Sequence, residues 1–238
     1  MESKFIAVVG GSHGIGLKIV ERCAALGAQV LVFSRTVGDL AQLPHALSQR
    51  VQHNPLDVLQ QAPAAEQFPA VLHGFVYAPG SIELGMLRGL DPQQLRDDFE
   101  LNVIGAVRCF QAALAGLKAA RGSAVFFSTV AVAQGLPMHS SIAAAKGALE
   151  ALVRTWAAEL APAVRVNAIA PALTDTPLAA KFLSTPEKRQ AMDARHPLGR
   201  IGTADDIAAM AEFLLGDQAT WITGQVHRVD GGLSSIRK

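Results

Sequence analysis

The chain has 238 residues, of which 50% are hydrophobic, 17% charged and 5% aromatic. This composition excludes a disordered chain, because disorder combines low hydrophobicity with high net charge. The formal net charge of +1 at pH 7 provides neither a basic field for nucleic acid nor a polybasic cluster for an anionic membrane. We therefore expect one α/β domain over residues 1–238, with no nucleic acid and no membrane as a partner.

The N-terminus and the two cysteines indicate a cytoplasmic protein. Met1 to Gly10 lead directly into a strand pattern, without the apolar stretch and cleavage site of a signal peptide. Cys23 and Cys109 fall inside helical patterns, which favours neither a disulfide nor a zinc site. The uncharged stretch Gly122 to Ala145 is long enough to span a bilayer, but polar residues interrupt it, so we interpret it as buried protein.

Short apolar runs alternate with longer helical patterns, which is typical of strand–helix–strand units around a parallel sheet. The first unit is complete by Phe33, with a helix that carries Ile15, Ile19 and Cys23 on its apolar side and ends at Gly27. Seven strands are predicted, at Phe5–Val9, Gln29–Phe33, Gln49–His53, Gly74–Tyr77, Ala124–Ser128, Arg165–Ile169 and Val226–Val229.

Two long alanine-rich helices are predicted over Pro92–Leu117 and Ile142–Leu160. The segment Thr176 to His196 is polar and rich in proline, and it follows the sixth strand, where an open α/β fold places a cover over its site. We expect this segment and the loop from Ser81 to Leu90 to shape a pocket whose substrate the sequence does not name. The elements together predict a doubly wound seven-stranded parallel sheet with helices on both faces.

Three glycines follow the first strand and open the first helix, in the string VVGGSHGIG. Small residues at Gly10, Gly14 and Gly16 let the backbone approach a pyrophosphate, and a helix N-terminus offers free amide donors to the anion. A plain tight turn would use the same glycines. The strand–turn–helix context nevertheless favours a dinucleotide site.

The end of the second strand carries residues that would bind the adenosine ribose. An acidic residue there would bind the 2′-hydroxyl of NAD, whereas an arginine can bind a 2′-phosphate. Arg35, next to Ser34 and helped by His13, therefore favours NADP(H) over NAD(H), with a solvated surface arginine as the alternative. Asp57 could accept from the adenine amino group or equally well cap a helix.

These features resemble the short-chain dehydrogenase/reductase family, and the resemblance runs from about Phe5 to Leu233. The strings RVNAIAPALTDTPL, HPLGRIGTADDIAAMAEFLL and ITGQVHRVDGG are similar to late segments of that family. The resemblance implies a Rossmann fold, hydride transfer with a small-molecule substrate, and a homodimer or homotetramer. It places the cofactor-binding residues at Gly10, Ser12, His13, Gly14, Ile15, Gly16, Ser34, Arg35, Asp57, Val58, Ala78, Gly80, Lys146, Pro171, Thr174 and Thr176.

The resemblance also assigns catalytic positions, and one of them is changed. Lys146 matches the lysine that binds the nicotinamide ribose, Asn102 matches the asparagine that holds a proton-relay water, and Thr129 stands at the catalytic serine. The family's catalytic tyrosine lies four residues before the lysine, where this chain has Ile142, and its one tyrosine is Tyr77. Because a positioned general acid contributes about 10²- to 10⁴-fold in rate, ordinary ketone reduction should be severely impaired.

Three ways around the missing tyrosine remain open. His139, seven residues before Lys146, could share its helix face and serve as the acid, or could lie before the helix as a cap, a role also expected of Ser140 and Ser141. A conjugated enone needs less acid catalysis, which predicts an enone or enoyl reductase. The third possibility is an NADP(H)-binding regulatory or assembly subunit without turnover. No metal-ligand spacing is present.

We interpret the sequence as an NADP(H)-dependent oxidoreductase that acts on a small or medium-sized carbonyl, alcohol or conjugated enone. In that interpretation Lys146 orients the nicotinamide ribose, Thr129 polarises the substrate oxygen, Asn102 supports a water and His139 is the acid.

Overall fold

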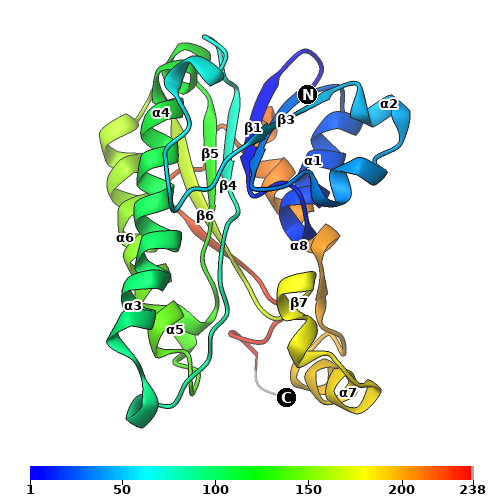
Figure 1. Cartoon of the computed structure of the whole chain (residues 1–238), viewed down its shortest axis with the longest axis vertical. Helices are drawn as coiled ribbons and strands as arrows, with labels where there is room; N and C mark the ends of the chain where they lie inside the picture. The colour runs from blue at the N-terminus through cyan, green and yellow to red at the C-terminus, as the bar shows by residue number, and fades with distance from the viewer. Residues whose placement is uncertain (237–238) are drawn as a thin grey trace.

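A seven-stranded sheet forms the centre of the computed structural model, which describes residues 1–236 (Figure 1). The strand order is β3-β2-β1-β4-β5-β6-β9, and all pairs in this sheet are parallel. The order reverses between β1 and β4, which creates the switch point where open α/β sheets bind ligands. The strands are β1 Phe5–Val9, β2 Gln29–Ser34, β3 Val51–Pro55, β4 Gly74–Tyr77, β5 Ser123–Phe127, β6 Arg165–Pro171 and β9 Val226–Val229, and a separate pair joins β7 Thr174–Asp175 to β8 Gly202–Thr203.

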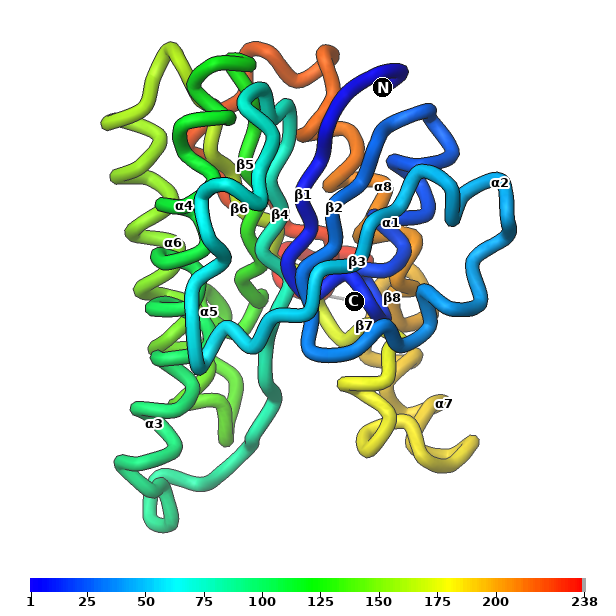
Figure 2. The backbone as a smooth tube through the Cα atoms, turned by 45° about the horizontal axis from the view of Figure 1, so that its top comes forward, coloured from blue at the N-terminus to red at the C-terminus, as the bar shows by residue number. Residues whose placement is uncertain are grey.

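Helices cover both faces of the sheet (Figures 1 and 2). Successive strand residues point to opposite faces, so Ile6 and Val8 join the hydrophobic cluster under one helix layer, while Ala7 and Val9 join the cluster under the other. One layer holds α1 and α8, and the other holds α4 and α6, which confirms the predicted doubly wound architecture. The helices are α1 Gly14–Ala25, α2 His45–Ser48, α3 Pro92–Phe99, α4 Gly105–Ala120, α5 Ala131–Gln134, α6 Ser140–Leu160, α7 Pro186–Arg195 and α8 Ala204–Leu215.

All seven predicted strands are present, and the differences lie at their ends. β3 begins at Val51 rather than Gln49, because Gln49 caps the short helix α2. β6 continues past Ile169 to Pro171, which carries the chain further toward the carboxyl edge of the sheet. That edge therefore extends beyond what the apolar runs in the sequence mark out.

The helix predicted over Pro92–Leu117 is interrupted by a π-helical segment, η4, at Glu100–Ile104. A π-turn inserts a residue into a helix and occurs frequently at functional sites. The Tyr77 hydroxyl donates to the Leu101 carbonyl within this segment at 2.6 Å, and Gly105 leaves room for that hydroxyl, because a Cβ there would collide with it. The segment buries Asn102 completely and fixes its position beside the end of β4.

One helical run, Pro92–Ala120, is long and apolar enough to cross a membrane by length and composition. Core helices pass the same test, and Phe110 of this run packs against Phe75 and Phe126 of the sheet at ring-centre distances of 5.6 and 5.3 Å. The stretch Gly122 to Ala145 contains a central strand and the short helix α5 rather than one long helix.

We expect Gly16→Ala to lower the free energy of unfolding by about 1–3 kcal/mol, because a Cβ on Gly16 would collide with the Gly10 carbonyl oxygen and push α1 off the turn. Gly147→Ala in α6 is the matched control. The nearest atom to its Cβ, Val132 Cγ1, lies at 3.7 Å, so this helix-interior change should stabilise by about 0.5–1 kcal/mol. Urea denaturation of both variants tests the packing, and equal stability of Gly16→Ala and the unsubstituted chain would contradict it.

Candidate active site

The glycine turn lies at the carboxyl end of β1 and leads into α1. Gly10 and Gly14 adopt φ angles of 79° and 55°, in the left-handed region that favours glycine. Gly16 brings the start of α1 directly onto the turn. The N-cap residue His13 makes no side-chain capping bond, so the amides of the first helical turn remain available to an anion.

The residues expected to bind adenosine gather at the ends of β2 and β3, and the fold already uses several of them. The Ser34 hydroxyl donates to the Thr36 carbonyl at 2.9 Å, and Asp57 Oδ1 accepts from the Leu59 amide at 3.0 Å. The Val58 side chain is buried in the hydrophobic core, which leaves its backbone as the part that could contact a nucleotide. Of these residues, Asp57 retains one carboxylate oxygen for a ligand.

Arg35 and His13 differ in how far they are engaged. Arg35 is exposed and forms no ion pair within residues 1–236, so its guanidinium can meet a phosphate. His13 instead contacts Asp39, with Nδ1 and Oδ2 2.9 Å apart, and the Asp39 amide donates to the Ser12 carbonyl at 3.1 Å. The loop after β2 is thereby held against the glycine turn.

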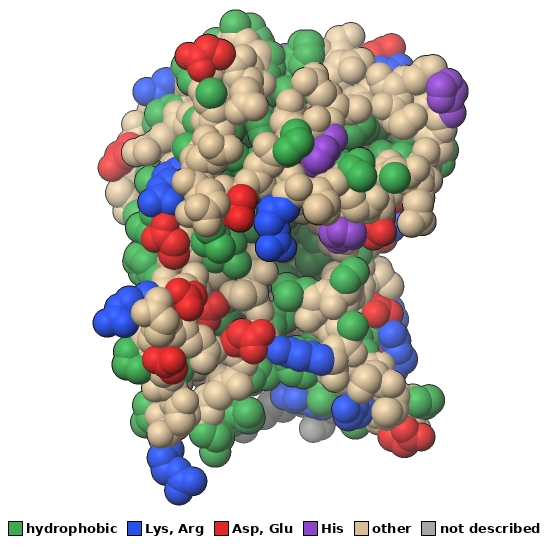
Figure 3. Space-filling model, viewed as in Figure 1, with side chains coloured by type: hydrophobic (Ala, Val, Ile, Leu, Met, Phe, Trp, Pro, Cys, Tyr) green, Lys and Arg blue, Asp and Glu red, His purple; other side chains and the backbone are tan. Residues whose placement is uncertain are grey.

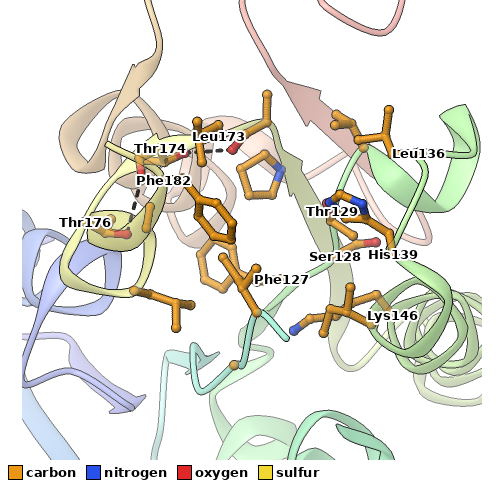
Figure 4. A pocket seen from close by; sticks show the side chains of 18 of the residues that line it. Phe127, Ser128, Thr129, Leu136, His139, Lys146, Leu173, Thr174, Thr176 and Phe182 are labelled. Atoms are coloured by element: carbon orange, nitrogen blue, oxygen red, sulfur yellow. Dashed lines mark hydrogen bonds between the residues drawn. The ribbon is translucent and has the colours of Figure 1, made fainter. Parts of the chain in front are cut away.

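A cavity of about 490 Å³ opens at the carboxyl edge of the sheet. Thr129, His139 and Lys146 lie on one side of it, and Thr174, Thr176 and Phe182 on the other (Figure 4). The predicted cover, Thr176 to His196, folds as the 3₁₀ segment η5 Pro177–Phe182 and helix α7. On the surface this segment forms one lobe, and hydrophobic side chains lie between it and the rest of the molecule (Figure 3). Most of the lining is apolar, with Phe127, Leu136, Met138, Ile142, Leu173, Leu178, Phe182, Met192 and Leu233. Ile15, Ala78, Gly80, Pro171, Thr174 and Thr176, all expected near the cofactor, line the same cavity.

Lys146 extends from α6 into this cavity (Figure 4). It is 6% exposed, and burial lowers the pKa of its ammonium to about 8, while the nearby Asp98 acts in the opposite direction. A Cβ on Gly80 would lie 3.8 Å from Lys146 Nζ and 3.7 Å from Asn102 Oδ1. Gly80 thus leaves open space between a cation and an amide oxygen.

Asn102 supplies an unsatisfied acceptor at this corner. Its Nδ2 donates to the Asp98 carbonyl at 2.8 Å and to Ser81 Oγ at 3.3 Å. Its Oδ1 is buried and has no hydrogen-bond partner in the described part of the chain. Because buried polar atoms normally have partners, this oxygen marks a place for a water or a ligand hydroxyl.

Thr129 and His139 both line the cavity, but His139 does not lie on the helix face that carries Lys146. Thr129 Oγ1 accepts from the Ala131 amide at 3.3 Å, which leaves its own proton free to donate. α6 begins at Ser140, so His139 is the residue before the helix rather than part of the face that carries Lys146. His139 Nδ1 lies 2.7 Å from the Pro137 carbonyl, and only a protonated Nδ1 can donate there, which leaves Nε2 toward other partners.

The prediction that Ser140 and Ser141 cap α6 is wrong, because Ser140 is the first residue of the helix and no side-chain capping bond closes this end. Ser141 is buried, and its hydroxyl donates to Asp98 Oδ2 at 2.5 Å, so it joins α6 to α3 instead of closing a helix end. Sequence reasoning missed Asp98, and it placed Ser81 in a pocket-forming loop without giving its hydroxyl a role. Asp98 lies among the charged residues of LRDDFE and has the pattern of a solvated helix face, so only its burial distinguishes it from Asp97.

No tyrosine hydroxyl reaches the cavity. Ile142, four residues before Lys146, is 4% exposed and contributes an apolar wall. The chain's one tyrosine, Tyr77, is buried in the core, donates to a backbone carbonyl, and has a pKa that burial raises well above its ordinary value. Its proton is therefore committed to the fold.

Comparisons with known proteins identify relatives in the family that the sequence resembles. Residues 9–234 match the family described as enoyl-(acyl carrier protein) reductase. The 2-(S)-hydroxypropyl-CoM dehydrogenase 3 of Xanthobacter autotrophicus is 33% identical over 252 residues, which covers 99% of this chain and 98% of that protein. A structure described as a short chain dehydrogenase/reductase family protein has a TM-score of 0.87 at 30% identity over 99% of both chains. A variant of actinorhodin polyketide ketoreductase with NADPH has a TM-score of 0.88 at 25% identity, over 99% of this chain and 100% of that one.

Replacing Lys146 by Met should stabilise the chain. In the unfolded state the lysine has its ordinary pKa of 10.5, and the lowering to about 8 on folding corresponds to a penalty of roughly 3 kcal/mol while both states are charged. The penalty is complete below pH 8 and disappears as pH rises through 10.5. We expect Lys146→Met to unfold at higher denaturant at about pH 7, with the gap closing toward about pH 10.

The exposed Lys118 of α4 provides the control, since Lys118→Met should change stability by less than about 0.5 kcal/mol. A Lys146→Met chain that is less stable at neutral pH would contradict a net cost of burying this ammonium.

Proposed function

Because the chain belongs to the short-chain dehydrogenase/reductase family, we propose that it is an NADP(H)-dependent oxidoreductase for a small or medium-sized, largely apolar carbonyl, alcohol or conjugated enone. The observation that carries the proposal is the apolar cavity of about 490 Å³ beside the glycine turn, with Lys146 and Thr129 in its wall. We also propose that the chain is one domain, that it is cytoplasmic and that it forms a homodimer or homotetramer. Light scattering on the purified protein would report the oligomeric state.

The residues of the site fit a nicotinamide dinucleotide. The turn at Gly10 and Gly14 provides a cradle without side chains and leads to a helix N-terminus with open amides. Lys146 and the unpartnered Asn102 Oδ1 meet at the space that Gly80 leaves, and both can bind hydroxyls of a ribose or an ordered water. When bound, the reduced cofactor supplies the hydride.

The chain's own residues would position the substrate. The free proton of Thr129 can donate to a carbonyl oxygen, which favours the charge that develops there during hydride transfer. The apolar walls, including Ile142 and Phe182, exclude water from the reacting atoms. Lys146 keeps a positive charge in the cavity below about pH 8, which favours anionic groups.

A preference for NADP(H) is proposed from Arg35. Its guanidinium is exposed at the end of β2, and a bidentate donor suits a 2′-phosphate. The solved polyketide ketoreductase relative is described with NADPH, which agrees with this choice.

The competing function is an NADP(H)-binding subunit without turnover, and Ile142 is the observation behind it. The position that would carry a phenol is occupied by an apolar side chain in contact with the cavity. The names of the Xanthobacter dehydrogenase 3 and of the polyketide ketoreductase do not favour this alternative. A second Xanthobacter relative, 35% identical over 178 residues, is named as an inactive dehydrogenase. An enone reductase remains compatible with the same cavity, because an enone needs less acid.

Titration of the purified protein with NADPH and NADH, followed by nicotinamide fluorescence, tests the cofactor proposal. NADPH should bind more tightly, and Arg35→Ala should weaken NADPH binding about 10- to 100-fold, because hydrogen bonds to charged groups contribute about 1.5–3 kcal/mol. NADH, which lacks the 2′-phosphate, is the internal control and should be unaffected. Equal binding of both cofactors would refute the assignment of Arg35.

Ile142→Tyr tests the consequence of the missing phenol. We expect it to raise NADPH-dependent ketone reduction about tenfold or more, because it places a general acid one helical turn from Lys146. Ile142→Phe is the matched control, since it adds the ring without the hydroxyl. Equal rates for the Tyr and Phe variants would show that this position does not limit proton supply.

A further inference from the structure

A buried carboxylate lies behind the wall of the cavity, beside Lys146. Asp98, in the last turn of α3, is 4% exposed and accepts hydrogen bonds from two hydroxyls: Ser81 bonds Oδ1, and Ser141 bonds Oδ2 at 2.5 Å. We call Ser81, Asp98 and Ser141 the Asp98 cluster. Removing a carboxylate from water is unfavourable unless hydrogen bonds and opposite charge compensate, and here two donors and the Lys146 cation do so.

Ser81 connects this carboxylate to the cavity. Ser81 lines the cavity, whereas neither Asp98 nor Ser141 is among its lining residues. Ser81 Oγ also accepts from Asn102 Nδ2 at 3.3 Å, so its oxygen is held while its proton is directed to Asp98. Ser81 is therefore the residue that lies between the cavity and the buried carboxylate.

Other cavity hydroxyls are engaged differently. Thr174 and Thr176 donate to backbone carbonyls at 3.0 and 3.3 Å. Ser128 donates to Glu150 at 2.6 Å, and Glu150 also forms an ion pair with Arg154 at 3.7 Å. Within residues 1–236 no arginine forms an ion pair with Asp98, and two hydroxyl groups donate to its carboxylate instead.

We propose that Ser81 and Asp98 form a proton-transfer pair that serves the substrate oxygen in place of the hydroxyl that Ile142 lacks. The proposal rests on the proposed function, because it needs a hydride-transfer reaction to serve. It places the proton chemistry on the loop after β4 and on α3, away from the helix position that usually carries it.

The step balances in both directions. In oxidation, the alcohol O–H bond breaks and its proton passes to Ser81 Oγ, while the Ser81 proton passes to Asp98. The C–H bond also breaks, and its hydrogen leaves with the electron pair as hydride to NADP⁺. In reduction, the hydride from NADPH forms the C–H bond, the oxygen takes the Ser81 proton, and Ser81 recovers a proton from protonated Asp98. Asp98 exchanges its proton with water between turnovers. The observed hydrogen bonds, in which both carboxylate oxygens accept, are those of the base that oxidation needs.

Asp98→Asn and Ser81→Ala test the pair. The probes are acetophenone, cyclohexanone and 2-octanone with NADPH, and the corresponding alcohols with NADP⁺. Both variants should lower turnover by about 100-fold or more, as loss of a general acid–base does, while NADPH binding changes less than about threefold. Asp97→Asn is the matched control, because Asp97 is the neighbouring but exposed carboxylate of α3 and should leave turnover within about threefold.

Asp98→Asn in the Ile142→Tyr background separates a role of Asp98 in proton transfer from a structural role. If Asp98 transfers a proton, a phenol at position 142 bypasses it, and Asp98→Asn should then change turnover less than about threefold. If Asp98 only holds α3 against α6, the loss should be the same in both backgrounds, which would overturn the proposal.

Four further outcomes also overturn it. Turnover that survives Asp98→Asn and Ser81→Ala would remove the pair and leave the proposed function intact. Loss on His139→Ala with no loss on Asp98→Asn would assign the acid to His139. Turnover seen only in the Ile142→Tyr chain would show that the natural chain has no stand-in acid. NADPH binding with no turnover in either chain would refute the proposed oxidoreductase itself, and the pair with it.

Discussion

Helices on both faces of the parallel sheet confine the chemistry of this protein to one edge. Ile6, Ala7 and Val8 are fully buried, so the interior of this central strand offers only apolar packing. Backbone donors and acceptors become available only where strands end and the chain turns, at the glycine turn after β1 and at Gly80 after β4. The cofactor turn, the substrate cavity and the catalytic candidates lie together because the sheet leaves them no other place.

That edge also holds two charges that water would stabilise better. Lys146 has its pKa lowered by burial, and Asp98 is compensated by two serine hydroxyls and by the nearby Lys146 cation. Helix α6 carries Lys146 on the face that also presents Ile142 to the cavity. The fold therefore gives up stability at Lys146 to keep a cation in an apolar cavity, which is typical of a site maintained for binding.

The architecture was predictable because its signal is local. The apolar runs and the helical spacing of Ile15, Ile19 and Cys23 reflect burial against neighbouring elements, and the glycine turn requires backbone angles that the residue type reveals. The site could be predicted from the sequence only at the glycine turn and at positions that match a family motif. Lys146 and Asn102 could be assigned by resemblance, but the π-helical segment around Asn102 leaves no mark in the hydrophobic pattern, and the predicted caps missed the bond from Ser141 to Asp98.

The roles proposed for cofactor binding and for proton transfer fall on different parts of this chain, so one can persist while the other changes. The glycine turn and Lys146 belong to α1 and α6, whereas Ser81 and Asp98 belong to the loop after β4 and to α3. An apolar residue at position 142 therefore removes a hydroxyl without altering the backbone cradle or the lysine. The cavity keeps its dry wall there, and a buried carboxylate can serve the reacting oxygen only because Ser81 joins it to the cavity.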